Sequence, residues 1–236
     1  MLTSLKDRSV LVIGRGGGIA RATVLAVREA GADVFVAGRE PEALAAAYDD
    51  VTAELLDVTD EASIAALAER LGTVDHVVST ASARARGRIG DLQPTAILQS
   101  LATKVVGPIL LAKHFAPRMP EDGSFVFFSG ATARKPAPGM LAVSATNGAV
   151  DAAVRALAVE LAPIRVNAIS PGTIDTGAYD ALGEQRKAEL FAQRAAHSPA
   201  RRVGRPEDAA DAVVFALTSS FTTGVSLGVD GGEPLV

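Results

Sequence analysis

The sequence predicts an α/β protein built on a doubly wound parallel sheet of about seven strands, with helices on both faces. Short β-branched runs alternate strictly with longer alanine-rich stretches, the order typical of parallel sheets with crossover helices. Most of the short runs are almost wholly apolar, as strands buried on both faces are. A chain of 236 residues suits one core, so we expect residues 1–236 to form a single domain.

Strands and helices are expected in alternating order along the chain. The apolar runs predict strands at Ser9–Ile13, Asp33–Ala37, Thr52–Leu56, Asp75–Thr80, Ser124–Ser129, Ile164–Ile169 and Ser226–Val229. The alanine-rich stretches predict helices at Ile19–Ala30, Glu42–Ala47, Glu61–Leu71, Pro94–Arg118, Met140–Leu161 and Pro206–Ser219. The least regular stretch, about 170–205, leaves the sixth strand at the sheet edge where ligands bind, and we expect a substrate lid there. An ordinary surface excursion is the alternative.

Composition narrows the class of protein. Apolar residues make up 48% of the chain and the formal net charge is -4, which argues against a nucleic-acid partner. The chain has no cysteine, which excludes disulfides and sulfur-ligated metals, and His76, His114 and His197 show no metal-ligand spacing, so we expect no metal. No apolar run approaches the roughly 20 residues that cross a bilayer, so no membrane partner is expected. The N-terminus lacks a signal-peptide pattern, and a cytoplasmic location is the expectation.

The first predicted strand runs directly into a glycine-rich turn. Gly14, Arg15, Gly16, Gly17 and Gly18 precede Ile19 and the first helical pattern. Glycines let the backbone approach a pyrophosphate closely, and the helix N-terminus offers unpaired N–H groups to the anion. Because this turn joins the first strand to the first helix, we expect a dinucleotide phosphate site there instead of a merely flexible loop.

The end of the second strand bears on the choice of cofactor. A ribose 2′-hydroxyl usually needs a carboxylate about 20 residues beyond the glycines, whereas a 2′-phosphate needs cations. This strand ends in Gly38 and Arg39, and Arg15 in the turn could reach the same phosphate. The sequence therefore predicts NADP(H) in preference to NAD(H), with a solvated Arg39 as the alternative.

These motifs resemble the classical short-chain dehydrogenase/reductase family, which has a Rossmann fold. The family's T-G-x-x-x-G-I-G motif matches residues 13–20 with its first and last positions changed, and its P-G-x-x-x-T segment matches residues 171–176. The C-terminal stretches 204–208 and 223–232 are also typical of the family. The resemblance implies the following additional cofactor contacts: Asp57 and Val58 at the adenine, Thr80 and Ala81 after the fourth strand, and Pro171, Gly172, Ile174 and Thr176 at the nicotinamide.

At the four positions that hold the catalytic Asn, Ser, Tyr and Lys in the family, this chain has other residues. Neither tyrosine begins a Y-x-x-x-K motif, because Tyr48 is followed four residues later by Thr52 and Tyr179 by Gly183. The family positions are occupied by Lys104 for Asn, Gly130 for Ser, Val143 for Tyr and Asn147 for Lys. Valine cannot donate the proton that carbonyl reduction requires, so the standard mechanism cannot operate.

Three side chains are candidates to replace the lost groups. Lys104 either returns a positive charge to the pocket or is a solvated helix lysine. Ser129 either hydrogen-bonds a carbonyl, as Thr132 could also do, or is a strand-end residue that satisfies the backbone. Tyr179 on the lid either swings inward as an acid or packs at the rim, and we favour packing.

Two functions of different class follow. One is an NADP(H)-dependent oxidoreductase acting on a carbonyl or alcohol through a non-standard or impaired site. The alternative is a catalytically silent NADP(H)-binding protein with a sensing or assembly role.

The resemblance implies a homodimer or homotetramer joined through the helices Pro94–Arg118 and Met140–Leu161. Five basic residues follow the fourth and fifth strands, namely Arg84, Arg86, Arg88, Arg134 and Lys135. They either attract an anionic substrate or cofactor phosphate or are solvated loop charges, and we favour the second interpretation.

Overall fold

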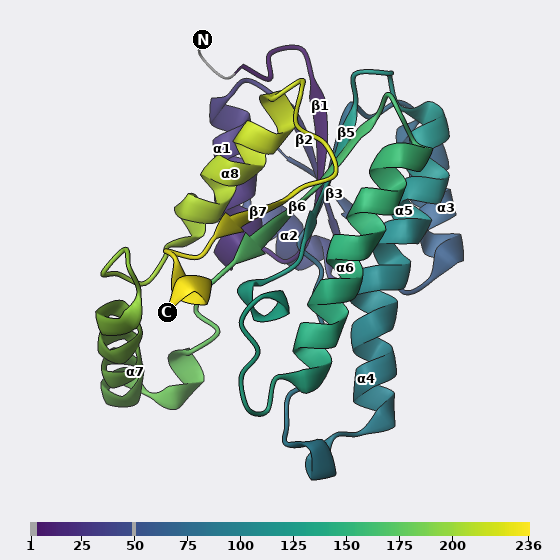
Figure 1. Ribbon diagram of the computed structural model, residues 1–236. Coiled ribbons are helices and arrows are strands. Elements are labelled where there is room, and N and C mark those ends of the chain that lie inside the picture. The colour runs from purple at the N-terminus through teal and green to yellow at the C-terminus, as the bar shows by residue number, and fades with distance from the viewer. Residues whose placement is uncertain (1–3, 49–50) are drawn as a thin grey trace.

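A computed structural model describes residues 4–48 and 51–236 and contains one seven-stranded sheet in the order β3-β2-β1-β4-β5-β6-β7 (Figure 1). Every neighbouring pair of strands is parallel, which confirms the predicted doubly wound fold class. The strands are β1 (Ser9–Ile13), β2 (Asp33–Gly38), β3 (Thr52–Leu55), β4 (His76–Ser79), β5 (Ser124–Phe128), β6 (Arg165–Pro171) and β7 (Ser226–Val229).

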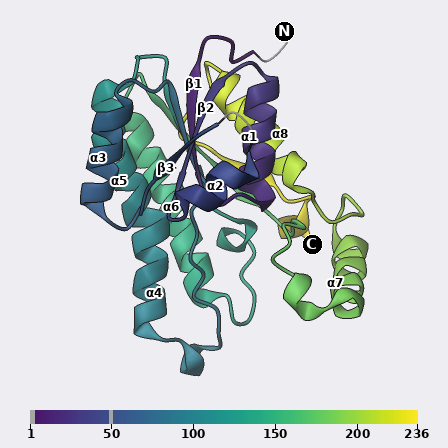
Figure 2. The ribbon, with the colours of Figure 1, turned by 180° about the vertical axis from the view of Figure 1, so that it is seen from behind.

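The helices form a layer on each face of the sheet. One layer holds α1 (Gly18–Glu29), α2 (Pro41–Ala47) and α8 (Pro206–Thr218), and the other holds α3 (Glu61–Leu71), α4 (Pro94–Leu101), α5 (Gly107–Phe115) and α6 (Leu141–Glu160), as Figures 1 and 2 show. Each layer has its own apolar core. Leu67, Phe115 and Val154 pack on one face, and Val24 and Val213 on the other. This arrangement brings the carboxyl ends of all strands to a common edge, where the predicted site residues meet.

The predicted long helix Pro94–Arg118 is interrupted in its middle. A π-helical turn, Ala102–Val106, lies between α4 and α5, and Gly107 N–H donates to the carbonyl of Ala102. Proline explains the turn, because Pro108 has no N–H to give the Lys104 carbonyl and its ring would clash with that carbonyl in a regular helix. The interruption places Lys104 on the widened turn.

The same helical segment bears on the expectation about membranes. Pro94–Arg118 is long and apolar enough to cross a bilayer by length and composition, with a mean hydropathy of 1.5 in the richest window. The prediction that no apolar run approaches that length is therefore wrong by this measure. The segment packs against α3 and α6, and 39% of that window is buried inside the protein.

The expected lid contains a helix that the sequence analysis missed. Residues 184–197 form α7 (Glu184–His197), which stands apart from the sheet in Figure 1. Lys187 ties α7 to the preceding loop through Asp175 (2.9 Å) and Asp180 (2.7 Å). No residue of α7 is fully buried, and its apolar stripe is narrow, with Leu190, Phe191 and Ala195 only half-buried, so it is a weak signal in the sequence.

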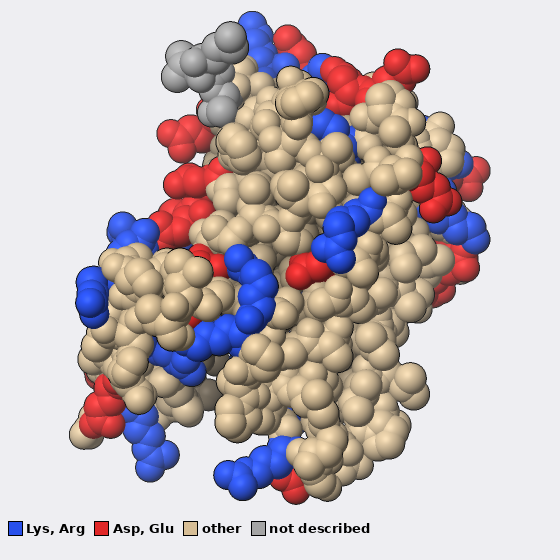
Figure 3. Space-filling model, viewed as in Figure 1, with Lys and Arg blue, Asp and Glu red and all other residues tan. Residues whose placement is uncertain are grey.

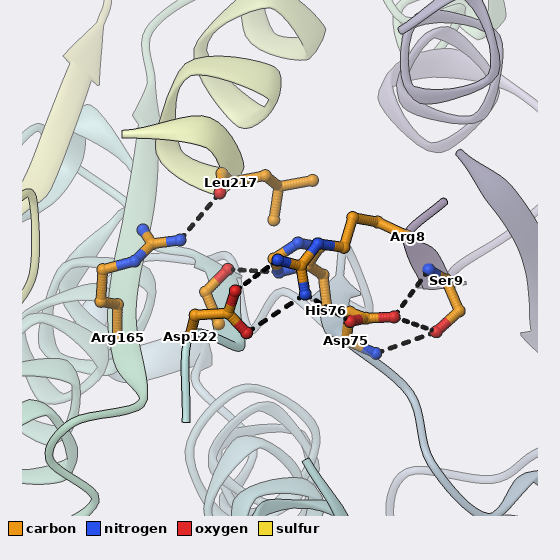
Figure 4. Close-up of polar contacts among 8 residues, drawn as sticks. Arg8, Ser9, Asp75, His76, Asp122, Arg165 and Leu217 are labelled. Carbon is orange, nitrogen blue, oxygen red and sulfur yellow. Dashed lines mark hydrogen bonds and ion pairs between the residues drawn. The ribbon is translucent and has the colours of Figure 1, made fainter. Parts of the chain in front are cut away.

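Polar residues link the loops at the opposite, amino edge of the sheet, as Figure 4 shows. Arg8 binds both Asp75 (2.8 Å) and Asp122, and it joins the loops before β1, β4 and β5. The ring of His76 is buried and its Nδ1 lies 2.9 Å from Ser124 Oγ. Burial lowers the pKa of His76 to about 4, so the ring is neutral at pH 7. This edge holds the strands together and leaves the carboxyl edge for ligands.

Candidate functional site

The glycine turn has the shape of a phosphate cradle. A Cβ on Gly14 would lie 2.3 Å from Thr80 Oγ1, and Thr80 Oγ1 donates to the carbonyl of Ile13 (3.0 Å). No side chain caps α1, which leaves its first N–H groups free for an anion. Gly18 has φ 55°, and a Cβ there would lie 3.1 Å from Thr176 Cβ. The turn therefore fits a pyrophosphate and contacts the segment after β6.

The adenosine end of the site carries both cations and an acid. Arg15 and Arg39 are exposed at the ends of β1 and β2. Asp57 accepts hydrogen bonds from Thr59 N (2.9 Å) and Thr59 Oγ1 (2.7 Å). These bonds lower the pKa of Asp57, and Arg39 lowers it further, so the carboxylate is charged. Arg39 and Asp57 thus lie near each other, on neighbouring strands of the sheet. Val58 follows Asp57 and is buried.

The segment after β6 closes the other end of the cradle. Gly172 N–H donates to the carbonyl of Val229 (3.0 Å), and the Gly172 backbone passes so close to Asp230 that a Cβ would lie 2.8 Å from its Cα. Ile174 is buried and forms an isolated bridge with Gly204 at the base of the lid. Pro171, at the end of β6, and Ala81, after β4, are partly buried at the same edge.

Lys104 and Asn147 form a buried pair at the centre of the site. Lys104 is only 8% exposed, and its Nζ donates to Asn147 Oδ1 (2.5 Å) and to the carbonyl of Ser129 (3.2 Å). Burial, with a smaller effect of the charge of Arg84 that Asp151 opposes, lowers the pKa of Lys104 to about 8. Lys104 is therefore not a solvated helix lysine. It is a buried cation bonded to two neutral oxygens.

Gly130 leaves room for the amide that holds this lysine. Asn147 Nδ2 donates to Thr132 Oγ1 (2.8 Å), and a Cβ on Gly130 would lie 2.7 Å from the same nitrogen. Val143 lies one helical turn before Asn147 on α6 and is partly buried. In the alignment with the family, Lys104 occupies the position of the catalytic asparagine and Asn147 that of the catalytic lysine. The two residue types are therefore exchanged between the two helices.

The other two candidate replacements have partners of their own. Ser129 Oγ donates to the carbonyl of Asn147 (3.1 Å), so it satisfies the backbone as the simpler alternative predicts. Tyr179 packs edge-on against Phe191 of α7, with ring centroids 5.3 Å apart. The structure brings Ser129 to Lys104 and Asn147 and keeps Tyr179 on the lid.

Neither the sheet edge nor the lid shows a metal site. No group of three or more His, Asp or Glu side chains within residues 4–48 and 51–236 is placed to hold a metal ion. A cleft of about 260 Å³ lies between α7 and the loop after β5, lined by Lys135, Gln193, Arg194 and His197. The hydrogen bonds of Lys104 and Asn147 go to each other, Ser129 and Thr132, and not to these residues, so this cleft lies outside the motifs identified above.

Known proteins resemble the whole chain. It matches the family described as Enoyl-(Acyl carrier protein) reductase over residues 14–233. The short-chain dehydrogenase/reductase ATR9 of Stachybotrys chlorohalonatus is 34% identical, covering 98% of both chains. The inactive 2-(S)-hydroxypropyl-CoM dehydrogenase 2 of Xanthobacter autotrophicus is 37% identical over 75% of this chain and 82% of its own. A small-chain dehydrogenase solved in complex with NADPH is 32% identical, with a TM-score of 0.87 over 98% of this chain and 100% of its own.

The match over nearly the full length, together with the cradle geometry, shows that this chain belongs to the short-chain dehydrogenase/reductase family. Its relatives are oxidoreductases that use small molecules, and a close structural neighbour binds NADPH.

Proposed function

We propose that this chain is an NADP(H)-dependent oxidoreductase that interconverts a carbonyl and an alcohol, with Lys104 in place of the family's tyrosine as the proton donor. The observation that carries the proposal is the buried Lys104–Asn147 pair, in which a cation meets only neutral acceptors. The chain acts as a single domain, with residues 170–205 as its substrate lid.

The cofactor fits the residues that surround the cradle. Gly14, Gly16, Gly18 and Ile19 would hold the pyrophosphate through backbone N–H groups, since α1 begins there without a side-chain cap. Arg15 and Arg39 would hold the 2′-phosphate, because both are exposed cations at the ends of neighbouring strands. Further contacts would come from Asp57 and Val58 at the adenine, Thr80 and Ala81 beside the turn, and Pro171, Gly172, Ile174 and Thr176 at the nicotinamide.

Lys104 supplies what Val143 cannot. When bound, the nicotinamide gives a hydride to the carbonyl carbon during reduction. The Lys104 ammonium would give a proton to the carbonyl oxygen and then recover one from solvent. The carbonyl, NADPH and one solvent proton would thus become the alcohol and NADP+, and Lys104 would be charged again. With a pKa of about 8, Lys104 holds a transferable proton at neutral pH. Asn147 and the carbonyl of Ser129 position its Nζ.

A silent cofactor-binding protein with a sensing or assembly role is the second candidate. It is favoured by the absence of a Y-x-x-x-K motif and by the relative described as inactive. This candidate keeps the cradle and gives Lys104 and Asn147 a purely structural role. It predicts NADPH binding without turnover of any carbonyl compound.

We also propose that two or four copies of the chain associate through α4–α5 and α6. Both helices expose large apolar side chains, namely Leu98, Val106 and Ile109 on the first pair and Leu141 and Val159 on the second. Light scattering coupled to gel filtration tests this, with a monomer as the contrary result.

The deciding experiment is a fluorescence titration with NADPH, with NADH as the control, followed by a screen of carbonyl compounds. Tight NADPH binding and turnover that Lys104→Met abolishes would support the oxidoreductase. Binding with no turnover across the screen would favour the silent protein. If neither nucleotide binds, both candidates are wrong.

A further inference from the structure

The cleft between α7 and the loop after β5 is lined by basic and amide side chains. Its volume is about 260 Å³, and within the described residues its lining consists of Lys135, Gln193, Arg194 and His197. Two of these side chains are cations at neutral pH and none is an acid. The glycine turn takes no part in this lining, so the cleft is separate from the cofactor cradle. Figure 3 shows Lys and Arg side chains gathered where the α7 lobe meets the rest of the molecule.

Both walls of the cleft are tied to the body of the protein. Lys135 Nζ donates to the backbone oxygens of Glu233 (3.0 Å) and Val236, so Lys135 is not the freely solvated loop charge that the sequence favoured. On the other wall, α7 ends next to Ser198, which is 2% exposed and donates through its Oγ to the carbonyl of Gly231 (2.9 Å). The cleft is therefore formed before a ligand arrives, which lowers the entropy cost of binding.

Donors remain free on both walls of the cleft. The guanidinium of Arg194 makes no hydrogen bond or ion pair within residues 4–48 and 51–236. An ammonium has three N–H groups, so Lys135 keeps one beyond the two that its backbone partners use. His197 Nδ1 donates to the carbonyl of Gln193 (2.8 Å), since a carbonyl oxygen can only accept, and Nε2 is left for another partner.

One acid borders the cleft from a smaller hollow beside it. Glu233 lines that hollow together with Lys135, Arg194 and His197, and its Oε1 accepts a hydrogen bond from Thr173 N–H (3.0 Å). Glu233 forms no ion pair with Lys135 or Arg194. One acid against two cations leaves an excess of positive charge, which favours an anionic ligand.

We propose that this cleft binds the phosphate group of a small molecule, at a site distinct from the cofactor cradle. A phosphate monoester carries a charge of about −1.5 to −2 at pH 7 and three acceptor oxygens, which match the two cations and the separate donors of the two walls. Arg194 suits this group because a guanidinium donates two parallel N–H bonds to a phosphate. A volume of about 260 Å³ lies at the small end of ligand pockets, so a short ester fits and a dinucleotide does not. The inference does not rest on the oxidoreduction proposed above.

A bound phosphate would join the lid to the body of the protein. Lys135 lies on the loop after β5, whereas Gln193, Arg194 and His197 lie on α7. Because no residue of α7 is fully buried, a ligand that bridges the two walls would hold the helix more firmly. Occupancy of the cleft should therefore slow the opening of α7.

The test uses inorganic phosphate and glycerol 3-phosphate as probes, with glycerol and the dicarboxylate succinate as controls. Binding is measured by calorimetry on the full chain, without NADP+ and at saturating NADP+, which keeps the probes out of the cofactor cradle. Arg194→Gln is the test variant, because its side chain has no partner whose loss would disturb the fold. Arg186→Gln is the matched control, because it removes the same charge from α7 but does not line the cleft.

We expect both phosphates to bind in the presence of NADP+. Arg194→Gln should raise their Kd about tenfold to a hundredfold, and Arg186→Gln should leave it unchanged. At a probe concentration of about ten times the Kd, hydrogen exchange of the α7 amides should be about tenfold slower than without the probe. Unchanged exchange would overturn the bridging of the two walls.

Three results would overturn the phosphate site itself. If no probe binds, Arg194 and His197 only complement the C-terminal end of α7. If Arg194→Gln binds the phosphates as tightly as the wild type does, they bind elsewhere. If succinate binds as tightly as the phosphates, the cleft does not select a phosphate group. A chain that fails to bind NADP+ would refute the proposed function alone, because the comparison of Arg194→Gln with Arg186→Gln still decides the cleft.

Discussion

Replacing Gly130 with alanine tests whether Asn147 needs the space beside Gly130 in order to keep its hydrogen bond with Lys104. The Gly130 backbone is extended, with φ 170°, a conformation that alanine adopts freely. The new Cβ, however, would lie 2.7 Å from Asn147 Nδ2, so the amide must move. That amide donates to Thr132 and accepts from Lys104. The cost of Gly130→Ala therefore comes from the displaced amide and not from the backbone.

The size of the effect follows from the bonds at risk. A neutral hydrogen bond contributes about 1 kcal/mol and one to a charged group about 1.5–3 kcal/mol. Losing both lowers the free energy of unfolding by about 2–4 kcal/mol, which urea denaturation followed by circular dichroism resolves. Asn147→Ala loses the same bonds. In the Asn147→Ala background, Gly130→Ala should therefore cost almost nothing, and the coupling energy should be about 2 kcal/mol or more.

Gly148→Ala is the matched control. This glycine lies next to Asn147 on α6, and a Cβ there meets nothing within 4 Å. Alanine in a helix interior should leave stability unchanged or raise it by about 0.5–1 kcal/mol. The reasoning is refuted if Gly130→Ala destabilises the Asn147→Ala variant as much as it does the wild type.

Three other predictions concern the cofactor, the proton donor and the amino edge. Arg39→Ser should raise the Kd of NADPH about tenfold or more and leave that of NADH unchanged, as fluorescence titration would show; a parallel loss of both would place Arg39 outside the phosphate site. The rate of carbonyl reduction should fall as the pH rises through about 8, the pKa of Lys104, and Lys104→Met should lower it about 10²- to 10⁴-fold and flatten the profile. A profile that keeps its shape in Lys104→Met would assign the proton to another group. Burial gives His76 a folded-state pKa of about 4 against its ordinary value of 6.5, so its contribution to stability is full above pH 6.5 and is lost as the pH falls toward 4. The loss should approach about 3 kcal/mol and be absent in His76→Asn, which urea denaturation over pH 4–7 would measure against the wild type.

Much of the fold could be predicted from short stretches of sequence, because burial and backbone crowding restrict the residue types within each stretch. Val10 to Ile13 are buried on both faces of the sheet, so the first strand is a plain apolar run. The turn is recognisable in the sequence because a side chain at Gly14 would meet Thr80 and one at Gly18 would meet Thr176, so glycine is needed at both positions. The helix α7 escaped detection for the opposite reason, since no side chain in it is fully buried and its apolar stripe, Leu190, Phe191 and Ala195, is narrow.

The chemistry of the centre depends on contacts that no local pattern contains. The sequence alone determined that Tyr and Lys are missing from their expected spacing and that a lysine stands at position 104. Only the tertiary structure showed that this lysine is buried and bonded to Asn147, a residue 43 positions away on another helix. Burial and partners set the charge and the pKa of a side chain, and both arise only when distant segments pack together.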